Sequence, residues 1–233
     1  MKRSREKEQM DLSGLDAGVL EKDLSNLRTI NRYLGAYRGV LWSLRRLKRR
    51  GDGALSLLDV GTGNGDLPKR IVEWGRESGI PVSIVALEPH PVTVAVAREY
   101  TRDFPEIAIV RGDGLRPPFS PGAFDFVLAS QLLHHFSEEE ILDLLQRWSK
   151  LARRGILVSD LVRHPLAYYG IFWLTRFLTR NEMTLGDAPL SVRRAFTLAE
   201  WRELFSRAGI GEFRLFSFFP FRMLGVFFLA ESR

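Results

Sequence analysis

The feature that most constrains this chain is a glycine-rich turn between an apolar run and a helical pattern. The run at 54–60 is rich in leucine, and glycines then follow at every second position, at Gly61, Gly63 and Gly65. A helical pattern starts directly afterwards, with Asp66 in a capping position and Pro68 in the first turn, where a missing N–H costs nothing. Because backbone N–H groups and a helix N-terminus converge there, the turn predicts a site for an anion or a dipole.

Strand and helix patterns alternate after this turn. Apolar, β-branched segments predict strands at 82–88, 106–111, 124–130 and 155–160. Helical patterns separate them at about 66–77 and 91–102, and after a capping box at 137–140. Such alternation is typical of an α/β fold with a parallel sheet covered by helices on both faces.

The two ends of the chain depart from this alternation. Residues 1–18 are highly charged and we expect them to be loosely attached, whereas leucines spaced by three or four from Leu20 to Leu47 predict helix. Gly35 and Gly39 interrupt this stripe, so two helices or one bent helix are expected. Toward the C-terminus, the sequence predicts an apolar helix at 165–179, a polar loop at 181–191, a helix after the capping box at 197–200, and two phenylalanine-rich strands meeting at Pro220.

Composition narrows the classes of function. None of the 233 residues is cysteine, which excludes disulfides, thiolate metal sites and a thiol nucleophile, and is compatible with the cytoplasm. The charged N-terminus is not followed by the apolar core of a secretory signal, and no run reaches the roughly 18 apolar residues of a membrane span. A net charge of +6 favours anionic partners without choosing between phosphates and a lipid surface.

The glycine pattern also discriminates between ligands. A dinucleotide fingerprint would need a third glycine at position 66, where this chain has a carboxylate, Asp66. The pattern present, D-x-G-x-G-x-G from Asp59, resembles motif I of the class I S-adenosylmethionine (SAM) methyltransferases. The resemblance covers about 54–233 and implies a Rossmann-like fold, with a seven-stranded, mostly parallel sheet, an antiparallel C-terminal hairpin and an N-terminal helical cap.

The same resemblance implies a cofactor site for SAM, with S-adenosylhomocysteine as product. The turn would hold the methionine end, Glu88 at the end of the next strand would bind the ribose, and Asp113 would meet the adenine. An ordinary Asp-Gly turn at Asp113 and a place beside a helix cap for Glu88 are the alternative interpretations. The residues implied are Asp59, Gly61, Thr62, Gly63, Glu88, Pro89, Asp113, Gly114, Ser130 and Gln131.

His134 is the candidate catalytic residue. It follows the strand at 124–130 and precedes an acidic helix start, where plant small-molecule O-methyltransferases carry a general base. A neutral imidazole there could take a phenol or enol proton. Relatives that methylate carbon also carry His-His at this place without such a role, and His135 is expected to pack or to cap the helix. The four histidines show no spacing that predicts a metal site, so the site is expected to lack a metal.

The acceptor is expected to be a small, lipophilic phenol, quinol or polyketide, methylated on oxygen or carbon, as in the quinone-biosynthesis and polyketide-tailoring branch. The segment 165–178 is apolar nearly all round, which predicts either a core helix or a lid over a lipophilic pocket. We therefore divide the chain into a tail and helical cap, 1–50, and a SAM-binding domain, 51–233, with a lid insertion at about 162–196. The candidate pocket residues are Tyr33, Tyr37, His135, His164, Tyr169 and Trp173.

Several alternatives stay open at this level. The basic run from Arg45 to Arg50, with Arg193 and Arg194, is either a solvated helix end or a contact with the inner face of an anionic membrane. RNA methylation is suggested by the net charge, although the chain lacks the thiol and the Asn/Asp-Pro-Pro-Tyr/Phe run of nucleobase methyltransferases. A SAM-binding regulator without turnover is the third possibility. Salt-sensitive RNA binding would favour the RNA methyltransferase, and tight SAM binding without turnover would favour the regulator.

Overall fold

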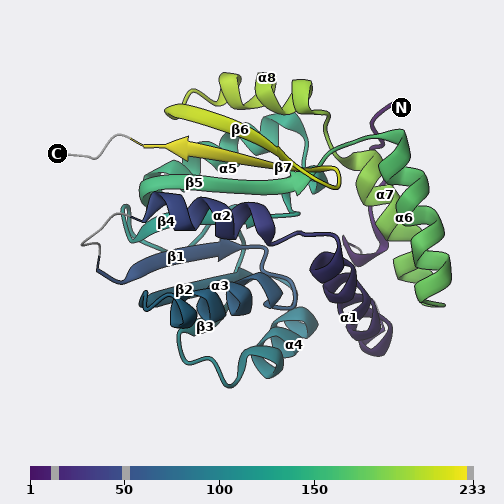
Figure 1. Cartoon of the computed structure of the whole chain (residues 1–233), viewed down its shortest axis with the longest axis horizontal. Coiled ribbons are helices and arrows are strands. Elements are labelled where there is room, and N and C mark those ends of the chain that lie inside the picture. Colours follow the sequence, from purple (N-terminus) through teal and green to yellow (C-terminus); the bar gives the residue numbers. More distant parts are fainter. Residues whose placement is uncertain (12–15, 49–52, 230–233) are drawn as a thin grey trace.

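The computed structural model describes residues 1–11, 16–48 and 53–229, and its centre is a seven-stranded sheet in the order β3-β2-β1-β4-β5-β7-β6 (Figure 1). The first five strands run parallel, and β7 is antiparallel to both of its neighbours. This is the predicted fold class. The strands are β1 Leu55–Val60, β2 Val82–Glu88, β3 Ile107–Arg111, β4 Phe124–Ser130, β5 Ala152–Leu161, β6 Glu212–Phe218 and β7 Arg222–Phe228.

Helices cover both faces of the sheet because its central strands are apolar on both sides. Helices α2 (Arg38–Leu47), α3 (Asp66–Glu77) and α4 (Pro91–Thr101) lie on one face, where Leu57 and Ile84 are fully buried. Helices α5 (Glu138–Leu151) and α8 (Leu198–Ala208) lie on the other face, around Trp148 and Trp201. Successive residues of one strand, such as Leu57 and Leu58, therefore point to opposite faces of the sheet and belong to different hydrophobic cores.

Three further helices gather at the carboxyl ends of the parallel strands, on the right of Figure 1: α1 (Ala17–Tyr33), α6 (Pro165–Leu178) and α7 (Glu182–Arg194). Ile30 of α1, Ile171 of α6 and Val192 of α7 share one small core. The break between α1 and α2 falls at Gly35, which has a positive φ of 71°. The predicted interruption of the N-terminal helical stripe is thus confirmed, and the helices form a cap over one edge of the sheet.

Two expectations from the sequence were wrong. The segment 181–191 is not a loop but most of α7, which begins at the N-cap Asn181 and contains Pro189. Burial explains this, because Met183, Ala188 and Val192 are packed against other helices, which outweighs the helix-breaking tendency of the proline.

The second error concerns the N-terminus, since residues 1–11 are held against the protein rather than loosely attached. The N–H of Ser4 donates to the carbonyl of Arg193, and the N–H groups of Gln9 and Met10 donate to Asp187. A short 3-10 turn, η1 (Gln9–Asp11), ends this segment. Among the described residues, no helix is long and apolar enough to cross a membrane.

Candidate active site

The glycine turn leaves an open space in front of its backbone. Gly61, Gly63 and Gly65 all have positive φ, at 67°, 58° and 77°. A Cβ on Gly63 would meet no atom within 4 Å, whereas one on Gly61 would lie 2.7 Å from Cδ1 of Leu132. Gly63 therefore faces the cavity, and Gly61 is required by packing. Gly65, rather than the expected Asp66, is the cap residue of α3, because the left-handed conformation at the end of the turn suits glycine.

Asp59 is buried at the end of β1 and shapes the turn from beneath. Its carboxylate accepts a hydrogen bond of 2.6 Å from the hydroxyl of Thr62. Burial raises the pKa of Asp59 to about 7, and the nearby carboxylates of Asp66 and Glu88 add to the rise. A cation placed above the turn would relieve this accumulation of negative charge.

Glu88, at the end of β2, reaches back to the same turn. One carboxylate oxygen accepts from the N–H of Gly63 at 3.1 Å and the other from the N–H of His90 at 3.1 Å. Burial raises the pKa of Glu88. Asp113 is exposed after β3 and accepts from the N–H of Leu115, and Pro89 and Gly114 lie along the same edge. Glu88 and Asp113 thus lie at the ends of two neighbouring strands, as the sequence predicted. Neither residue lines the cavity between the glycine turn and the helical cap.

A cavity of about 140 Å³ lies between the turn and the cap of helices, and we call it the polar cavity because many of the side chains that line it are polar. Asp59, Gly61, Thr62 and Gly63 line one wall, and Ser130 and Gln131 line another. Gln131 adopts a positive φ of 53°, unusual for a residue with a side chain. The structure therefore brings these six candidate residues, all named from the sequence, around one space.

The helical cap closes this cavity through α1 and the residue that caps α2. The buried side-chain amide of Asn64 donates to the carbonyl of Leu24 at 2.8 Å, and the hydroxyl of Tyr37 donates to Asp66 at 2.8 Å. Burial and the neighbouring Asp66 raise the pKa of Tyr37, so its phenol stays protonated. Tyr37 lines the cavity as expected, whereas the contacts of Asn64 and Asp66 with the cap were not foreseen.

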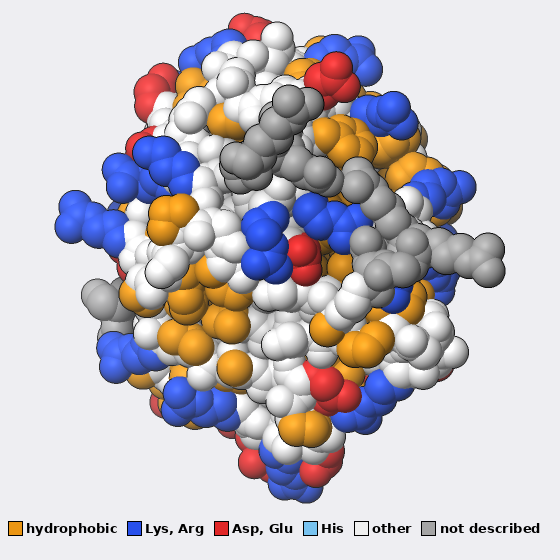
Figure 2. Space-filling view, turned by 90° about the vertical axis from the view of Figure 1, so that its left-hand side faces the viewer, with side chains coloured by type: hydrophobic (Ala, Val, Ile, Leu, Met, Phe, Trp, Pro, Cys, Tyr) orange, Lys and Arg blue, Asp and Glu red, His pale blue; other side chains and the backbone are white. Residues whose placement is uncertain are grey.

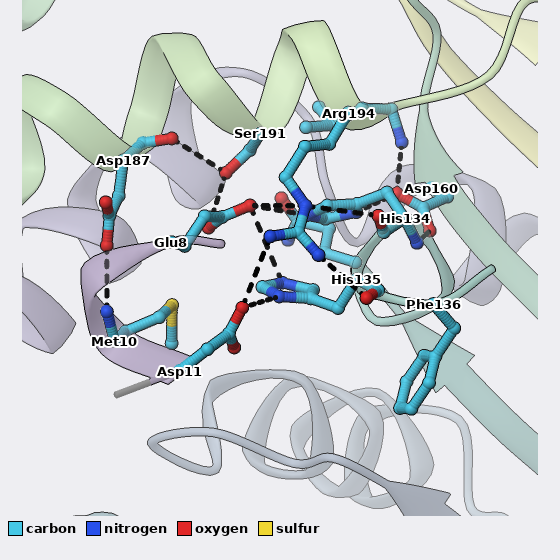
Figure 3. A network of polar contacts seen from close by, with 12 residues as sticks. Glu8, Met10, Asp11, His134, His135, Phe136, Asp160, Asp187, Ser191 and Arg194 are labelled. Carbon is cyan, nitrogen blue, oxygen red and sulfur yellow. Dashed lines mark hydrogen bonds and ion pairs between the residues drawn. The ribbon is translucent and has the colours of Figure 1, made fainter. Parts of the chain in front are cut away.

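His134 lies in the short turn η2 (Leu133–His135) and lines the same cavity. Its ring is buried, and Nδ1 lies 2.7 Å from the carboxylate of Asp160 at the end of β5. Although burial opposes ionisation of Asp160, the contact with His134 holds the pKa of that carboxyl below its usual value. The other ring nitrogen, Nε2, lies 3.6 Å from the carboxylate of Glu8 (Figure 3).

A second, apolar cavity of about 290 Å³ adjoins the first and shares Gln131, Asn31 and Leu161 with it. The inner face of α6 lines it through Ala167, Gly170, Ile171 and Leu174. Its polar end contains Arg222 of β7, which donates to the side-chain oxygen of Gln131 at 2.6 Å. Burial lowers the pKa of Arg222 to about 10.

Only part of the expected substrate pocket lies around these cavities. Tyr37 and His135 line the polar cavity, but Tyr33, Tyr169 and Trp173 are exposed, at 79%, 58% and 58%. His164 caps the start of α6 and stacks on Phe221, outside both linings. Helical spacing identified α6 correctly, but it could not tell the face toward the cavity from the face toward solvent.

The two basic clusters do not share a surface. Arg45, Arg46 and Lys48 lie at the C-terminal end of α2, on the side of the molecule opposite α6 and α7 (Figure 1). Figure 2 shows that opposite face, over which Lys and Arg side chains are widely spread. Arg49 and Arg50 lie outside the described residues. One flat membrane therefore cannot meet both α6 and the end of α2.

Sequence reasoning missed Glu8, Asp160 and Arg222. Asp160 resembles Glu88 in its place, since it lies next to the last residue of a parallel strand at the carboxyl edge of the sheet. Glu8 and Arg222 carried no signal, because they reach the site only through the packing of the chain's two ends.

Comparisons with known proteins agree with this geometry. A family model described as a methyltransferase domain matches residues 57–155. An uncharacterized methyltransferase of Geobacillus sp. (strain WCH70) is 29% identical over 99 residues, which are 42% of this chain and 43% of the relative. The match thus spans less than half the length of that curated relative.

Solved structures of methyltransferases share the fold. A SAM-dependent methyltransferase from Aquifex aeolicus superposes with a TM-score of 0.64 at 15% identity, over 90% of this chain and 98% of that chain. Human N-acetylserotonin methyltransferase in complex with SAM gives 0.66 at 19% identity, over 92% and 57%. Residues 57–155 therefore match the methyltransferase domain, and the chain as a whole has the Rossmann-like fold of the SAM-dependent methyltransferases.

Proposed function

We propose that this protein is a SAM-dependent methyltransferase whose acceptor is a small lipophilic molecule. The observation that carries the proposal is the junction of the two cavities. The first contains the glycine turn and the second is apolar, and they meet at Gln131. A cofactor bound on the turn would point its reactive end toward a pocket suited to an apolar acceptor. Since methyl transfer is an in-line displacement, holding the two reactants in line would supply much of the rate.

The cofactor's contacts follow from the turn. Its positively charged methionine end would lie near Asp59 and the backbone of Gly61 and Gly63, with S-adenosylhomocysteine left as product. The ribose would displace the N–H of Gly63 from Glu88, whose two oxygens can accept from both hydroxyls. Asp113 and Gly114 would meet the adenine at the adjoining edge.

The acceptor would place its polar end at the junction of the two cavities, near Gln131 and Arg222, with His134 in the lining of the first cavity. A phenol or enol of the quinol or polyketide type fits this combination of an apolar body and one oxygen. His134 is the candidate general base, because Asp160 beside Nδ1 would orient the ring and Nε2 lies on the side of the cavity that also holds Glu8. A carbon acceptor would not need this proton transfer.

The outward face of α6 is where we propose that such an acceptor enters from a lipid surface. Tyr169, Trp173 and Phe177 are 58–83% exposed on this face, and the opposite face of the same helix lines the apolar cavity. Binding to anionic vesicles should fall in Trp173→Ser and Phe177→Ser, and persist in Arg45→Ser at the far end. Equal binding by all three variants would contradict the proposal.

The test of the function combines SAM binding with turnover. Calorimetry should show SAM binding to the unmodified protein, weakened by about 1–3 kcal/mol in Glu88→Ala, as for charge-assisted hydrogen bonds. Mass spectrometry should then detect a methylated product and S-adenosylhomocysteine with alkylphenol acceptors. Unchanged affinity in Glu88→Ala would contradict the cofactor site, and SAM binding without turnover would favour the regulator. Salt-sensitive binding and methylation of RNA would favour the nucleic-acid alternative.

A further inference from the structure

Three side chains from two distant parts of the chain converge on one point of the polar cavity. Glu8 arrives with the N-terminal segment, and His134 and His135 arrive with η2 (Figure 3). Their candidate ligand atoms all lie within 4.8 Å of one another. The Nε2 atoms of His134 and His135 lie 3.6 Å and 3.9 Å from the same oxygen, Oε1 of Glu8.

That oxygen is buried without a hydrogen-bond partner. The side chain of Glu8 is only 2% exposed, and its other oxygen accepts from the hydroxyl of Ser191 at 2.9 Å. A buried carboxylate oxygen that accepts no hydrogen bond is poorly solvated, and the nitrogens within 4 Å of Oε1 are all too distant to donate to it, so a further interaction is expected at this point.

Each of the two histidines has a carboxylate beside its Nδ1 atom. Nδ1 of His134 is held by Asp160 at 2.7 Å, and Nδ1 of His135 by Asp11 at 3.0 Å. When each Nδ1–H donates to a carboxylate, each Nε2 carries a lone pair, and both lone pairs are on the side of Glu8. Carboxylates on the far nitrogen of the imidazole are the usual support of metal-binding histidines.

Among the described residues, Arg194 is the arginine within 4 Å of Oε1 of Glu8, and its N–H groups are directed elsewhere. Nε lies 3.7 Å from Oε1 of Glu8, but it donates to the carbonyl of His134. Nη2 donates to the carbonyl of His135, and Nη1 to that of Glu6. Arg194 therefore fixes the loop that carries the histidines and leaves Oε1 without a donor.

We propose that Glu8, His134 and His135 bind a divalent transition-metal cation of the Zn²⁺ type. Two imidazoles and one carboxylate are a donor set that suits such ions, and three protein ligands leave a further position open. Ligand atoms around a tetrahedral Zn²⁺ lie about 3.3–3.5 Å apart, so the observed 3.6 Å and 3.9 Å need only a small contraction. The carboxylates of Glu8, Asp11 and Asp160 offset the charges of Arg194 and the ion.

This site goes beyond the proposed methyl transfer and does not depend on it. An ion bound to Nε2 of His134 would occupy the lone pair that the general-base hypothesis uses. His134 can therefore act as a base only in the ion-free protein, and the two roles predict opposite effects of a chelator on turnover. Because the ion can be measured directly, neither outcome relies on activity.

The experiment titrates the chelator-treated full chain with Co²⁺, whose visible d–d absorption reports coordination by nitrogen and oxygen, and then displaces it with Zn²⁺. We expect one equivalent to bind. Glu8→Gln and His135→Asn should each weaken binding by more than about 100-fold, and Asp11→Asn, whose side chain meets Nδ1 of His135 and Nη1 of Arg194, by about 10-fold. His164→Asn is the matched control: it removes a histidine outside the cluster, and asparagine can still cap α6.

The proposal is overturned by absence of Co²⁺ and Zn²⁺ uptake in the unmodified protein. It is also overturned if binding survives in both Glu8→Gln and His135→Asn, or falls equally in His164→Asn. Circular dichroism of each variant shows that it is folded, and SAM calorimetry on the same samples separates failure of the metal site from failure of the cofactor site.

Discussion

The side-chain amide of Asn64 donates to the backbone carbonyl of Leu24 at 2.8 Å, and this buried bond joins the glycine turn to the helical cap. The oxygen of the same amide accepts from the N–H of Asp66, so Asn64 also supports the start of α3. Opening of α1 away from the cavity must break the first bond but can keep the second. Asn64 therefore couples closure of the cap to the shape of the turn.

Asn64→Ala should loosen α1 selectively. The carbonyl of Leu24 would lose a buried partner, at a cost of about 1–3 kcal/mol. Amide hydrogen exchange in α1 should accelerate while exchange in β4 and β5 changes little. Asn64→Asp is the matched variant: it can still accept from Asp66 but turns an oxygen toward the carbonyl of Leu24, so α1 should exchange at least as fast. Unchanged exchange in both variants would show that packing alone holds the cap.

Gly63→Ala should weaken SAM binding by more than its destabilisation of the folded state can explain. A methyl group there meets no protein atom, so it projects into the space proposed for the cofactor, and the positive φ adds about 1–2 kcal/mol of strain. Gly79→Ala is the control, because Gly79 has a similar φ of 64° and open surroundings after α3. Thermal melts should show similar destabilisation for both, whereas calorimetry should show lost SAM affinity only for Gly63→Ala. Equal affinities would contradict the placement of the cofactor.

Gly170→Leu should shift the preference of the protein toward acceptors with shorter alkyl chains. Gly170 lines the apolar cavity, and a Cβ there contacts nothing within 4 Å. With alkylphenols of growing chain length, kcat/KM should rise up to about fourfold per CH₂, near 0.8 kcal/mol each, until the cavity is full. In Gly170→Leu the rise should stop at a shorter chain, while exposed Phe177→Leu keeps the original series. A series that is flat in the unmodified protein would reject the lipophilic pocket and leave methyl transfer untouched.

Because Asp23 is buried, the free energy of unfolding should fall as the pH rises from about 4 to about 6. It is buried between α1 and α7, accepts from the hydroxyl of Thr184 at 2.6 Å, and its other oxygen has no partner. Burial raises its pKa from 3.8 to about 6, so the folded state binds this proton more tightly than the unfolded state. Stability is therefore fully retained below the unfolded pKa and reduced above about pH 6.

Asp23→Asn removes this dependence and should be more stable than the unmodified protein at pH 7, by at most about 3 kcal/mol, with the difference vanishing near pH 4. Urea unfolding at a series of pH values measures the effect. Asp103→Asn is the control, because the side chain of Asp103 is 84% exposed. An Asp23→Asn variant that follows the unmodified profile at every pH would show that the Asp23 charge is solvated.

The sequence alone determined the sheet and one wall of the site. The strands from β1 to β5 were recognisable because each is a short apolar run bounded by turn residues, and local signals of this kind do not depend on the rest of the chain. The glycine turn was recognisable for the same reason, since Gly61, Gly63 and Gly65 need positive φ wherever the segment lies. The resemblance to the methyltransferase family assigned Glu88 and Asp113 to the cofactor site, and both lie at the same edge of the sheet because β2 and β3 are parallel neighbours.

Only the tertiary structure decided what closes the site. Helix α7 contains Pro189, and local propensity argued against a helix that burial on several sides nevertheless stabilises. The exposed side of α6 and its cavity-lining side are equally apolar, so only the packing of α1 and α7 distinguishes them. Glu8 meets His134 because the N-terminal segment is held by Asp187 and Arg194, and contacts between residues so distant in sequence leave no local pattern. Sequence thus determines the surface on which a cofactor can lie, whereas long-range packing determines which groups face it.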